Sequence, residues 1–389
     1  MLIDPSDVAI CVAGDEEIEA QGAAPTSTPI VQTSLFTFPN FQALVDGLGA
    51  EHRSHVYTRG RNPTVEAVER KLAALERGEA CKCFGSGMAA ISAVMLGLLR
   101  SGDHILFVNH TYGPTLQLAE HLSRFGIEHD LLLDLDVHAF EQALRPNTQL
   151  VWLESPGTML FRVLDIPALT SVARERGIPT CVDNSWATPL CQKPLSLGAD
   201  IVVHSCTKYL AGHSDLVAGA VISTSERIEE IFFRAFLLNG GILAPFDAWL
   251  LLRGLRTLPI RLRQHEADAL RVARFLQGHP AVRRVFHPAL TEDSQLVERQ
   301  FSGYSGLLSF ELVRGDFESV ARFIDGLRRF RIGVSWGGVE SLVISPNRGT
   351  NRLELEARGI PPGMVRLSIG LEGSDVLIDD LAGALDLLG

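Results

Sequence analysis

Lys208 and Asp183 are the residues whose types and positions most directly indicate chemistry. Lys208 lies shortly after the apolar, β-branched segment 201–203, and Asp183 ends a second apolar segment, 178–182. Burial beyond a strand disfavours the ammonium form and lowers the pKa of an amine, which makes a lysine a candidate Schiff-base nucleophile. An amine and a carboxylate at two strand ends suggest pyridoxal phosphate (PLP). Lys208 would hold its aldehyde, and Asp183 would pair with its ring nitrogen.

Each of these two residues also has an ordinary interpretation. A lysine after a strand is usually a solvated loop residue, and an aspartate there is usually a turn or a helix cap. The cofactor interpretation is favoured because the chain also offers elements suited to a phosphate, to an aromatic ring and to a carboxylate.

The phosphate element is the segment 85–91, Gly-Ser-Gly-Met-Ala-Ala-Ile, which begins an almost wholly apolar helix running to Leu99. Backbone N–H groups at a helix N-terminus bind phosphate, and glycines permit its close approach. A Gly-rich entry to a buried helix is the alternative. Ser205 and Thr207, just before Lys208, could add hydroxyl donors.

Two further residues suit a flat cofactor and an amino-acid substrate. Tyr112 follows the apolar segment 105–108, where an aromatic ring can stack on the cofactor, although a core tyrosine is the more common case. Arg366 lies within an apolar strand pattern, and its guanidinium matches a carboxylate in a bidentate manner. An ionised Asp183 would keep the ring nitrogen protonated, which makes the ring an electron sink.

The elements that must position these residues follow an α/β pattern. Short apolar runs alternate with helical stretches between about 100 and 225, which predicts βαβ units, a mostly parallel central sheet and a ligand at the carboxyl ends of its strands. The expected strands are 104–108, 149–154, 178–182, 200–204 and 217–222, and the expected helices include 114–125, 138–144 and 166–176.

The remainder of the chain divides into an arm and a smaller domain. We expect residues 1–55 to form an extended N-terminal arm, 56–245 a PLP-binding domain and 246–389 a C-terminal α+β domain. In the last of these we expect one helix from about Phe246 past Arg263 and a separate helix over 265–277.

Composition excludes several classes of protein. The 389 residues are 46% hydrophobic, and the net charge of −11 argues against a nucleic-acid surface. We expect neither a membrane span nor a signal peptide. Cys81 and Cys83 are too close together for the usual zinc pair, so no metal is expected, and six scattered cysteines suggest a reducing, cytoplasmic location.

The chain resembles the Cys/Met-metabolism, or trans-sulfuration, family of PLP enzymes of fold type I, similar to aspartate aminotransferase in architecture. The resemblance extends from Thr28 to the carboxyl end. The segments that carry it most specifically are Tyr57-Thr58-Arg59, Asn62-Pro63-Thr64, Ser86-Gly87-Met88, Val182-Asp183-Asn184, Ser205-Cys206-Thr207-Lys208-Tyr209 and Gly212-His213-Ser214-Asp215.

The resemblance implies a role for each matching residue. Lys208 would carry the cofactor and move protons, Asp183 would pair with the ring nitrogen and Tyr112 would stack on the ring. Arg366, helped by Ser335, would bind the substrate α-carboxylate. The residues that would hold the phosphate are Gly87, Met88, Ser205 and Thr207, with Tyr57 and Arg59 reaching the phosphate of a neighbouring subunit. A homotetramer, built as a dimer of dimers with shared active sites, is implied.

Two variant stretches resemble bacterial cystathionine β-lyases. The chain has Glu-Ser-Pro-Gly-Thr at 154–158 and Ser-Trp-Gly-Gly at 335–338, and Trp336 could form a wall of the substrate pocket or belong to the core. We therefore expect β-elimination of L-cystathionine or of a related cysteine S-conjugate. Open alternatives are a γ-lyase or γ-synthase of the same family, a broad cysteine-conjugate β-lyase, and a binding protein that has lost turnover.

Overall fold

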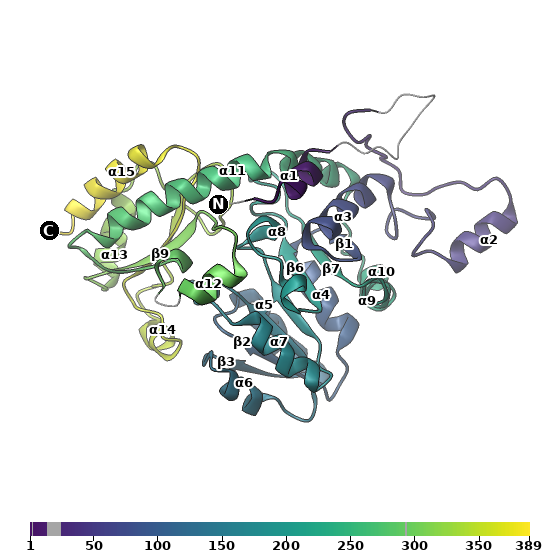
Figure 1. The fold of residues 1–389 in the computed structure, drawn as a ribbon, viewed down its shortest axis with the longest axis horizontal. Coiled ribbons are helices and arrows are strands. Elements are labelled where there is room, and N and C mark those ends of the chain that lie inside the picture. Colours follow the sequence, from purple (N-terminus) through teal and green to yellow (C-terminus); the bar gives the residue numbers. More distant parts are fainter. Residues whose placement is uncertain (2, 14–24, 292–293) are drawn as a thin grey trace.

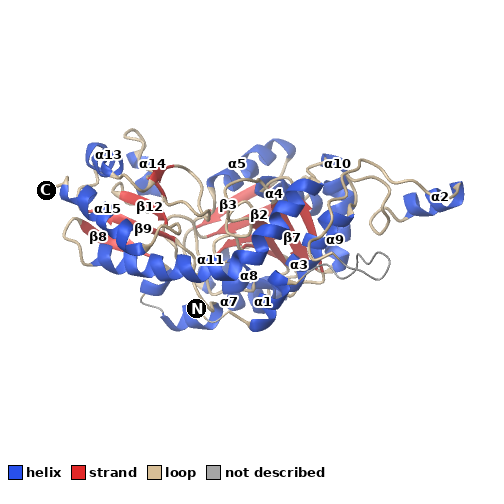
Figure 2. Ribbon diagram, turned by 90° about the horizontal axis from the view of Figure 1, so that it is seen from above, coloured by secondary structure: helices blue, strands red, loops and turns tan. Residues whose placement is uncertain are grey.

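The computed structural model of the chain describes residues 1, 3–13, 25–291 and 294–389. Its helices are α1 (Pro5–Val12), α2 (Phe41–Gly49), α3 (Pro63–Glu76), α4 (Gly87–Leu98), α5 (Gly113–Leu122), α6 (Val137–Ala143), α7 (Ile166–Glu175), α8 (Thr188–Cys191), α9 (Ser225–Ile231), α10 (Leu237–Asn239), α11 (Pro245–Gln277), α12 (Ser294–Gln300), α13 (Phe317–Gly326), α14 (Arg352–Ala357) and α15 (Ser374–Asp386). Two sheets lie side by side, and α11 runs along both (Figures 1 and 2).

The larger sheet has seven strands in the order β1-β7-β6-β5-β4-β2-β3. They are β1 (Ala80–Phe84), β2 (His104–Val108), β3 (Glu128–Leu132), β4 (Thr148–Glu154), β5 (Thr180–Asp183), β6 (Ile201–Ser205) and β7 (Gly219–Ser223). The five strands from β6 to β3 pair in parallel, and β7 runs antiparallel to both of its neighbours. The predicted mostly parallel α/β sheet is therefore confirmed.

The side chains of the central strands alternate between the two faces of the sheet, which explains why helices cover both faces. In β2, Ile105 and Phe107 pack in the hydrophobic cluster that includes α4, whereas Leu106 and Val108 pack in the cluster that includes α6 and α7. Successive side chains of a strand point to opposite faces, so a strand that is apolar throughout has to be covered on both sides.

The smaller sheet has five strands in the order β10-β11-β12-β9-β8. They are β8 (Val282–Phe286), β9 (Leu307–Leu312), β10 (Arg331–Ile332), β11 (Leu342–Ile344) and β12 (Met364–Ser368). β12 pairs antiparallel with β9 and β11, and the sheet packs through a shared hydrophobic cluster on α11, α13 and α15. This arrangement is the expected smaller α+β unit.

The predicted break in the long helix near residue 264 is wrong. α11 is one helix of 33 residues, with Pro259 inside it. Its buried stripe continues without interruption through Leu262, His265 and Ala269, and no glycine or proline separates the two predicted halves. Continuous burial on one face therefore carries the helix past residue 264 as a single element.

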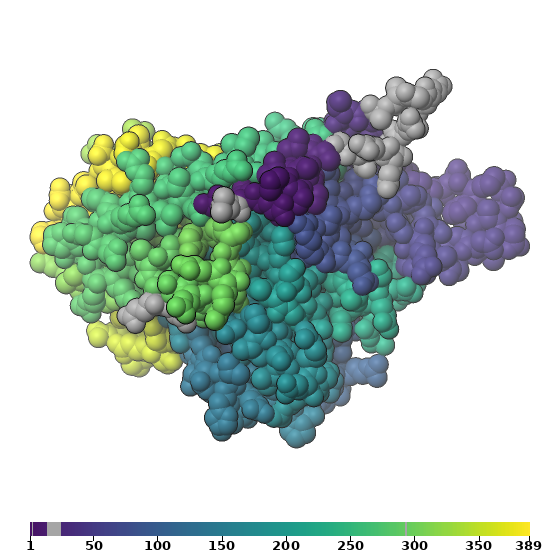
Figure 3. Space-filling view, viewed as in Figure 1, coloured from purple at the N-terminus to yellow at the C-terminus, as the bar shows by residue number. Residues whose placement is uncertain are grey.

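Residues 1–55, expected to form an extended arm, contain two helices in the part that is described. α1 packs against α3 and α11. α2 and the chain around it project from the body of the molecule (Figures 1 and 3), and Phe41, Val45 and Leu48 are exposed on α2. An apolar helix held away from its own core is a feature of chains that pack against another copy.

Candidate active site

A pocket of about 340 Å³ lies at the carboxyl ends of the central strands and is closed on one side by the smaller sheet. It brings together nine of the predicted residues: Gly87, Met88, Tyr112, Asp183, Ser205, Thr207, Lys208, Trp336 and Arg366. Ser335 joins them through a hydrogen bond to Lys208. Residues predicted from six separated stretches of the chain thus meet at one edge of the larger sheet.

Lys208 has the environment of a reactive amine. Its Nζ donates a hydrogen bond of 2.7 Å to Oγ of Ser335 and lies 5.2 Å from the centre of the Trp336 ring. Burial, together with the positive charge of Arg366, lowers the pKa of Lys208 to about 8, although the carboxylate of Asp183 acts in the opposite direction. A substantial fraction of the amine is therefore neutral, and hence nucleophilic, near neutral pH.

The pH dependence of cofactor capture tests this environment. Only the neutral amine attacks an aldehyde, so the rate at which the apoprotein captures PLP should rise with pH, with a midpoint near 8 rather than near the usual lysine value of 10.5. Stopped-flow absorbance measures the rate, and Nα-acetyl-lysine with free PLP is the matched reference. A midpoint shared with that reference would contradict the lowered pKa of Lys208.

Asp183 stands at the end of β5 without a basic partner. Its Oδ1 accepts a hydrogen bond of 3.0 Å from the backbone N–H of Ser185, and it forms no ion pair with any described residue. Burial raises the pKa of this carboxyl, while the hydrogen bonds from Ser185 and the charges of His204 and Lys208 lower it. A partly buried carboxylate of this kind, facing a pocket, is stabilised by a cationic ligand group such as a protonated ring nitrogen.

Glu154 is a second buried carboxyl beside Asp183, and it was not predicted as a site residue. The two are paired directly across β4 and β5, and burial together with the Asp183 charge raises the pKa of Glu154 well above its usual range. Glu154 Oε2 accepts a hydrogen bond of 2.7 Å from the backbone N–H of Tyr112, and it thereby holds the start of α5. The carboxyl ends of parallel strands align, so the position of Glu154 at the end of β4 was the signal that could have identified it.

The N-terminus of α4 provides the anion-binding end of the pocket. Ser86 caps the helix through a hydrogen bond of 3.0 Å from the Ala89 N–H to its Oγ, while Gly87 and Met88 line the pocket. A Cβ on Gly87 would lie 3.0 Å from Oγ of Ser205, so glycine allows this turn to contact the end of β6. The hydroxyl of Thr207 also lines the pocket and is held by the backbone of Ala218.

The substrate end of the pocket is built from the smaller sheet. Arg366, on β12, is 8% exposed and donates a hydrogen bond of 2.8 Å to the carbonyl of Val334. Burial lowers the pKa of Arg366 to about 10, and the structure shows no carboxylate paired with it among the described residues. A buried, unpaired guanidinium facing a pocket is suited to an incoming carboxylate.

Gly337 brings the loop that carries Ser335 and Trp336 against Lys208. Its φ of +85° is a backbone conformation that favours glycine, and a Cβ there would lie 2.7 Å from the backbone nitrogen of Tyr209. The Trp336 ring also packs 5.5 Å from the Tyr209 ring, centre to centre. Trp336 therefore fits both interpretations: it forms part of the pocket wall, and its ring packs on the buried ring of Tyr209.

Tyr57 and Arg59 lie outside this pocket. Tyr57 is exposed, and the Arg59 guanidinium lies 5.6 Å from the centre of its ring. Both are on the segment between the projecting α2 and α3. Their contact with the phosphate of a neighbouring subunit stays a prediction.

The pocket fits PLP in each of its parts. It combines an amine of lowered pKa, a partly buried carboxylate that forms no ion pair with a described residue, a glycine-lined helix N-terminus and a half-exposed tyrosine ring. These features, on this two-sheet fold, define a PLP-dependent enzyme of fold type I.

Comparisons with known proteins assign the chain within that class. The profile of the Cys/Met metabolism PLP-dependent enzymes matches residues 9–386. The chain belongs to this family, and PLP is its cofactor. It is 38% identical over 385 residues to a cystathionine gamma-lyase of Bacillus subtilis, covering 96% of this chain and 97% of the relative.

Other relatives are named for different reactions of the same family. The chain is 40% identical over 370 residues to a cystathionine beta-lyase of Lactococcus lactis subsp. cremoris, covering 92% of this chain and 94% of the relative. A solved structure of a cystathionine gamma synthase of Xanthomonas oryzae pv. oryzae, in complex with aminoacrylate and cysteine, superposes with a TM-score of 0.91 at 36% identity, covering 100% of this chain and 99% of that one.

Proposed function

We propose that the protein cleaves the C–S bond of L-cystathionine, or of a related cysteine S-conjugate, by β-elimination to a thiol, pyruvate and ammonia. The observation that carries the proposal is the position of one low-pKa amine, Lys208, between the unpaired Asp183 and the unpaired Arg366. Arg366 suits the α-carboxylate of an amino acid, and an amine beside it is placed to move the α-proton.

Each residue of the pocket would have a separate role in this reaction. PLP, when bound, supplies the electron sink that makes the α-proton acidic. Asp183 keeps the ring nitrogen protonated by remaining beside it as a carboxylate, and Tyr112 covers the ring. Gly87, Met88, Ser205 and Thr207 would hold the phosphate.

Lys208 would move both protons of the elimination. Its neutral amine takes the proton from the substrate α-carbon, and the resulting ammonium can give a proton to the departing sulfur. Ser335 fixes the direction of Nζ through its hydrogen bond of 2.7 Å. Burial raises the pKa of Tyr112, so its hydroxyl stays protonated at neutral pH and acts as a donor rather than as a base.

The competing proposal is γ-elimination or γ-replacement on the same cofactor. Relatives at 38–40% identity include enzymes named for β- and for γ-cleavage, so similarity favours neither. γ-Chemistry needs a further proton transfer at the β-carbon. Lys208 is the one amine among the described residues that line the pocket, and it could serve either reaction, so the preference for β-elimination rests on the stretches 154–158 and 335–338, which resemble those of bacterial cystathionine β-lyases.

The products formed from L-cystathionine distinguish these proposals. The PLP-loaded protein is incubated with L-cystathionine, and the keto acid is identified by mass spectrometry. Pyruvate with homocysteine is the expected result. Oxobutyrate with cysteine would replace β-elimination by γ-elimination, and the absence of both keto acids would reject cystathionine as a substrate.

We further propose that the active enzyme is a homo-oligomer, a tetramer in which each site is shared by two copies. The projecting α2 exposes 79% of Phe41, and Tyr57 and Arg59 lie outside the pocket of their own chain.

A cytoplasmic location is proposed on separate grounds, because all six cysteines are buried and free. Among the described residues, no helix has the length and apolar composition needed to cross a membrane.

Charging the exposed helix should weaken the assembly. Phe41→Glu is expected to raise the subunit dissociation constant about thirtyfold, because an apolar side chain of this size contributes about 2 kcal/mol when buried. Sedimentation velocity over a range of concentrations measures the change. Phe125→Glu is the matched control, since Phe125 is 63% exposed on the body of the molecule. Equal effects of the two variants would argue against α2 as the subunit contact.

A further inference from the structure

A second buried polar network lies outside the pocket, behind the strands that carry Asp183 and Lys208. Glu76, at the end of α3, is fully buried. Its Oε1 accepts a hydrogen bond of 2.8 Å from Nδ2 of Asn184 and lies 2.5 Å from Nε2 of His204. His204 is the one basic side chain paired with Glu76 among the described residues.

This network is joined by short backbone links to the cofactor residues. Asn184 directly follows Asp183, and its N–H donates a hydrogen bond of 3.0 Å to the carbonyl of Val203. His204 precedes Ser205, whose N–H donates a hydrogen bond of 2.7 Å to Oγ of Ser185. Glu76 therefore binds the two strand ends from the face opposite the pocket.

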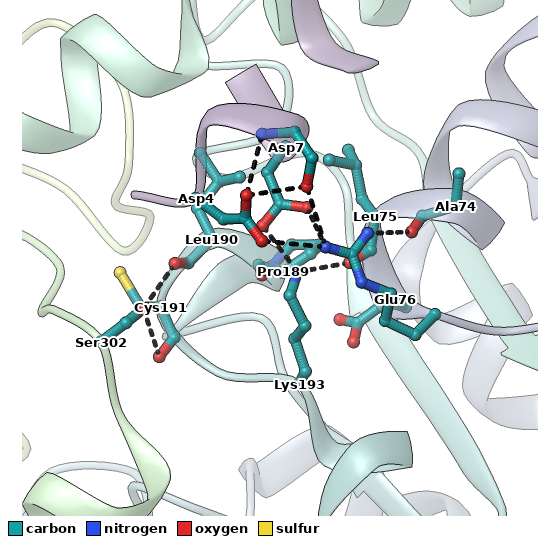
Figure 4. Close-up of polar contacts among 12 residues, drawn as sticks. Asp4, Asp7, Ala74, Leu75, Glu76, Pro189, Leu190, Cys191, Lys193 and Ser302 are labelled. Carbon is teal, nitrogen blue, oxygen red and sulfur yellow. Dashed lines mark hydrogen bonds and ion pairs between the residues drawn. The ribbon is translucent and has the colours of Figure 1, made fainter. Parts of the chain in front are cut away.

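The end of α3 that carries Glu76 is itself anchored. Lys193 Nζ donates hydrogen bonds of 2.6 Å to the carbonyl of Leu75 and 2.8 Å to that of Pro189, and it pairs at 2.8 Å with the buried Asp7 of α1. Figure 4 shows Asp7, Lys193 and Leu75 gathered beside Glu76. Arg77, which adopts the left-handed conformation at the end of α3, also pairs with Asp7 at 2.9 Å.

A charge on His204 also acts electrostatically on Asp183. Burial raises the pKa of Asp183, and a charge on His204 is among the causes that lower it. The charged groups around Asp183 are Lys208 on the pocket side, Glu154 on β4, and His204 with Glu76 behind β6. Glu76 is fully buried and lies within hydrogen-bonding distance of both Asn184 and His204, so its carboxylate fixes the positions of these two side chains.

We propose that Glu76 is a positioning residue, which acts through Asn184 and His204 to hold Asp183 in the orientation in which its carboxylate pairs with the cofactor ring nitrogen. The inference rests on the proposed pairing of Asp183 with that nitrogen. Glu76 itself touches neither cofactor nor substrate.

The protonation of the ring nitrogen is the direct test. PLP isotope-labelled at that nitrogen is bound to each variant, and its NMR chemical shift is measured. Asp183→Asn defines the shift expected when the carboxylate is lost. Glu76→Gln should move the resonance toward that limit and weaken PLP binding about tenfold, at the low end of what loss of an outer hydrogen-bonding partner costs at metal sites.

Glu69→Gln is the matched control. Glu69 is a buried glutamate of α3, about two turns before Glu76, and it pairs with Lys82 instead. This variant should lower the melting temperature but leave the nitrogen resonance unchanged. A resonance that is unchanged in Glu76→Gln, with only a lower melting temperature, would make the role of Glu76 merely structural and overturn the proposal.

Two further outcomes keep the roles of Asp183 and Glu76 apart. If Asp183→Asn leaves the resonance in place, the proposed role of Asp183 fails, and the inference about Glu76 fails with it. If Glu76→Gln does not fold, His204→Asn is used with the same readout. A wild-type resonance in that variant would reject the network as a determinant of the ring nitrogen.

Discussion

Lys208→Ala is expected to lower kcat on L-cystathionine by about 10³-fold or more, because one change removes both the nucleophile that carries the cofactor and the general base. PLP should still bind without a covalent bond, since the phosphate and ring contacts remain. Borohydride reduction followed by peptide mapping checks the attachment. The chain contains only four lysines, Lys71, Lys82, Lys193 and Lys208, so the modified peptide identifies the residue directly.

Lys208→Arg is the control that separates charge from nucleophilicity. Arginine keeps a positive charge beside Ser335 but is not deprotonated near neutral pH, so it should be as inactive as alanine. Turnover close to that of the wild type in either variant would reject Lys208 as the catalytic amine. A reduced PLP adduct on another lysine would have the same consequence.

Arg366→Leu is expected to lower kcat/KM for L-cystathionine by about 10²- to 10³-fold, because loss of one partner of a buried charge pair costs roughly 2–5 kcal/mol. The guanidinium is 8% exposed and forms no ion pair with a described residue, so its binding capacity is available to the substrate carboxylate. Steady-state kinetics, with PLP content measured in parallel, tests this assignment.

Removing Arg366 should also change the pH profile in a defined direction. The positive charge of Arg366 is, after burial, the second cause that lowers the pKa of Lys208. Without it that pKa rises, so less neutral amine is present at a given pH once the substrate has released Lys208, and the acidic limb of kcat moves to higher pH. At a pH high enough for the Lys208 amine to be neutral in both proteins, an analogue of cystathionine that lacks the α-carboxylate should be cleaved equally by the wild type and Arg366→Leu. A difference between them on that analogue would contradict carboxylate recognition.

The part of the site that could be predicted from sequence is the part built from strand ends. Asp183 directly follows an apolar segment and Lys208 comes shortly after another, and parallel strands bring their carboxyl ends to one edge whatever the remaining packing. The start of α4 was likewise recognisable, because a helix N-terminus binds anions through local backbone geometry. Local sequence therefore brought the candidate cofactor residues to one pocket.

The rest of the site depends on contacts between distant segments. Ser335 and Trp336 reach Lys208 only because Gly337 allows their loop to lie against the backbone of Tyr209. Glu154 ends the expected strand 149–154, but the sequence does not show that this strand lies beside the one that ends at Asp183. Such positions follow from tertiary packing, which periodicity and capping signals do not encode.

α11 has a consequence for any attempt to divide the protein. Over about 50 Å, the helix places Leu262 in the hydrophobic core of the larger sheet and Ala269 in that of the smaller. A shortened chain that ended before Pro245 would uncover the first core, and one that began after Gln277 would lack a wall of the second. Gene fragments divided at the apparent boundary between the sheets should therefore yield insoluble halves. Two overlapping fragments that both contain α11 should restore a folded enzyme more readily when they are expressed together.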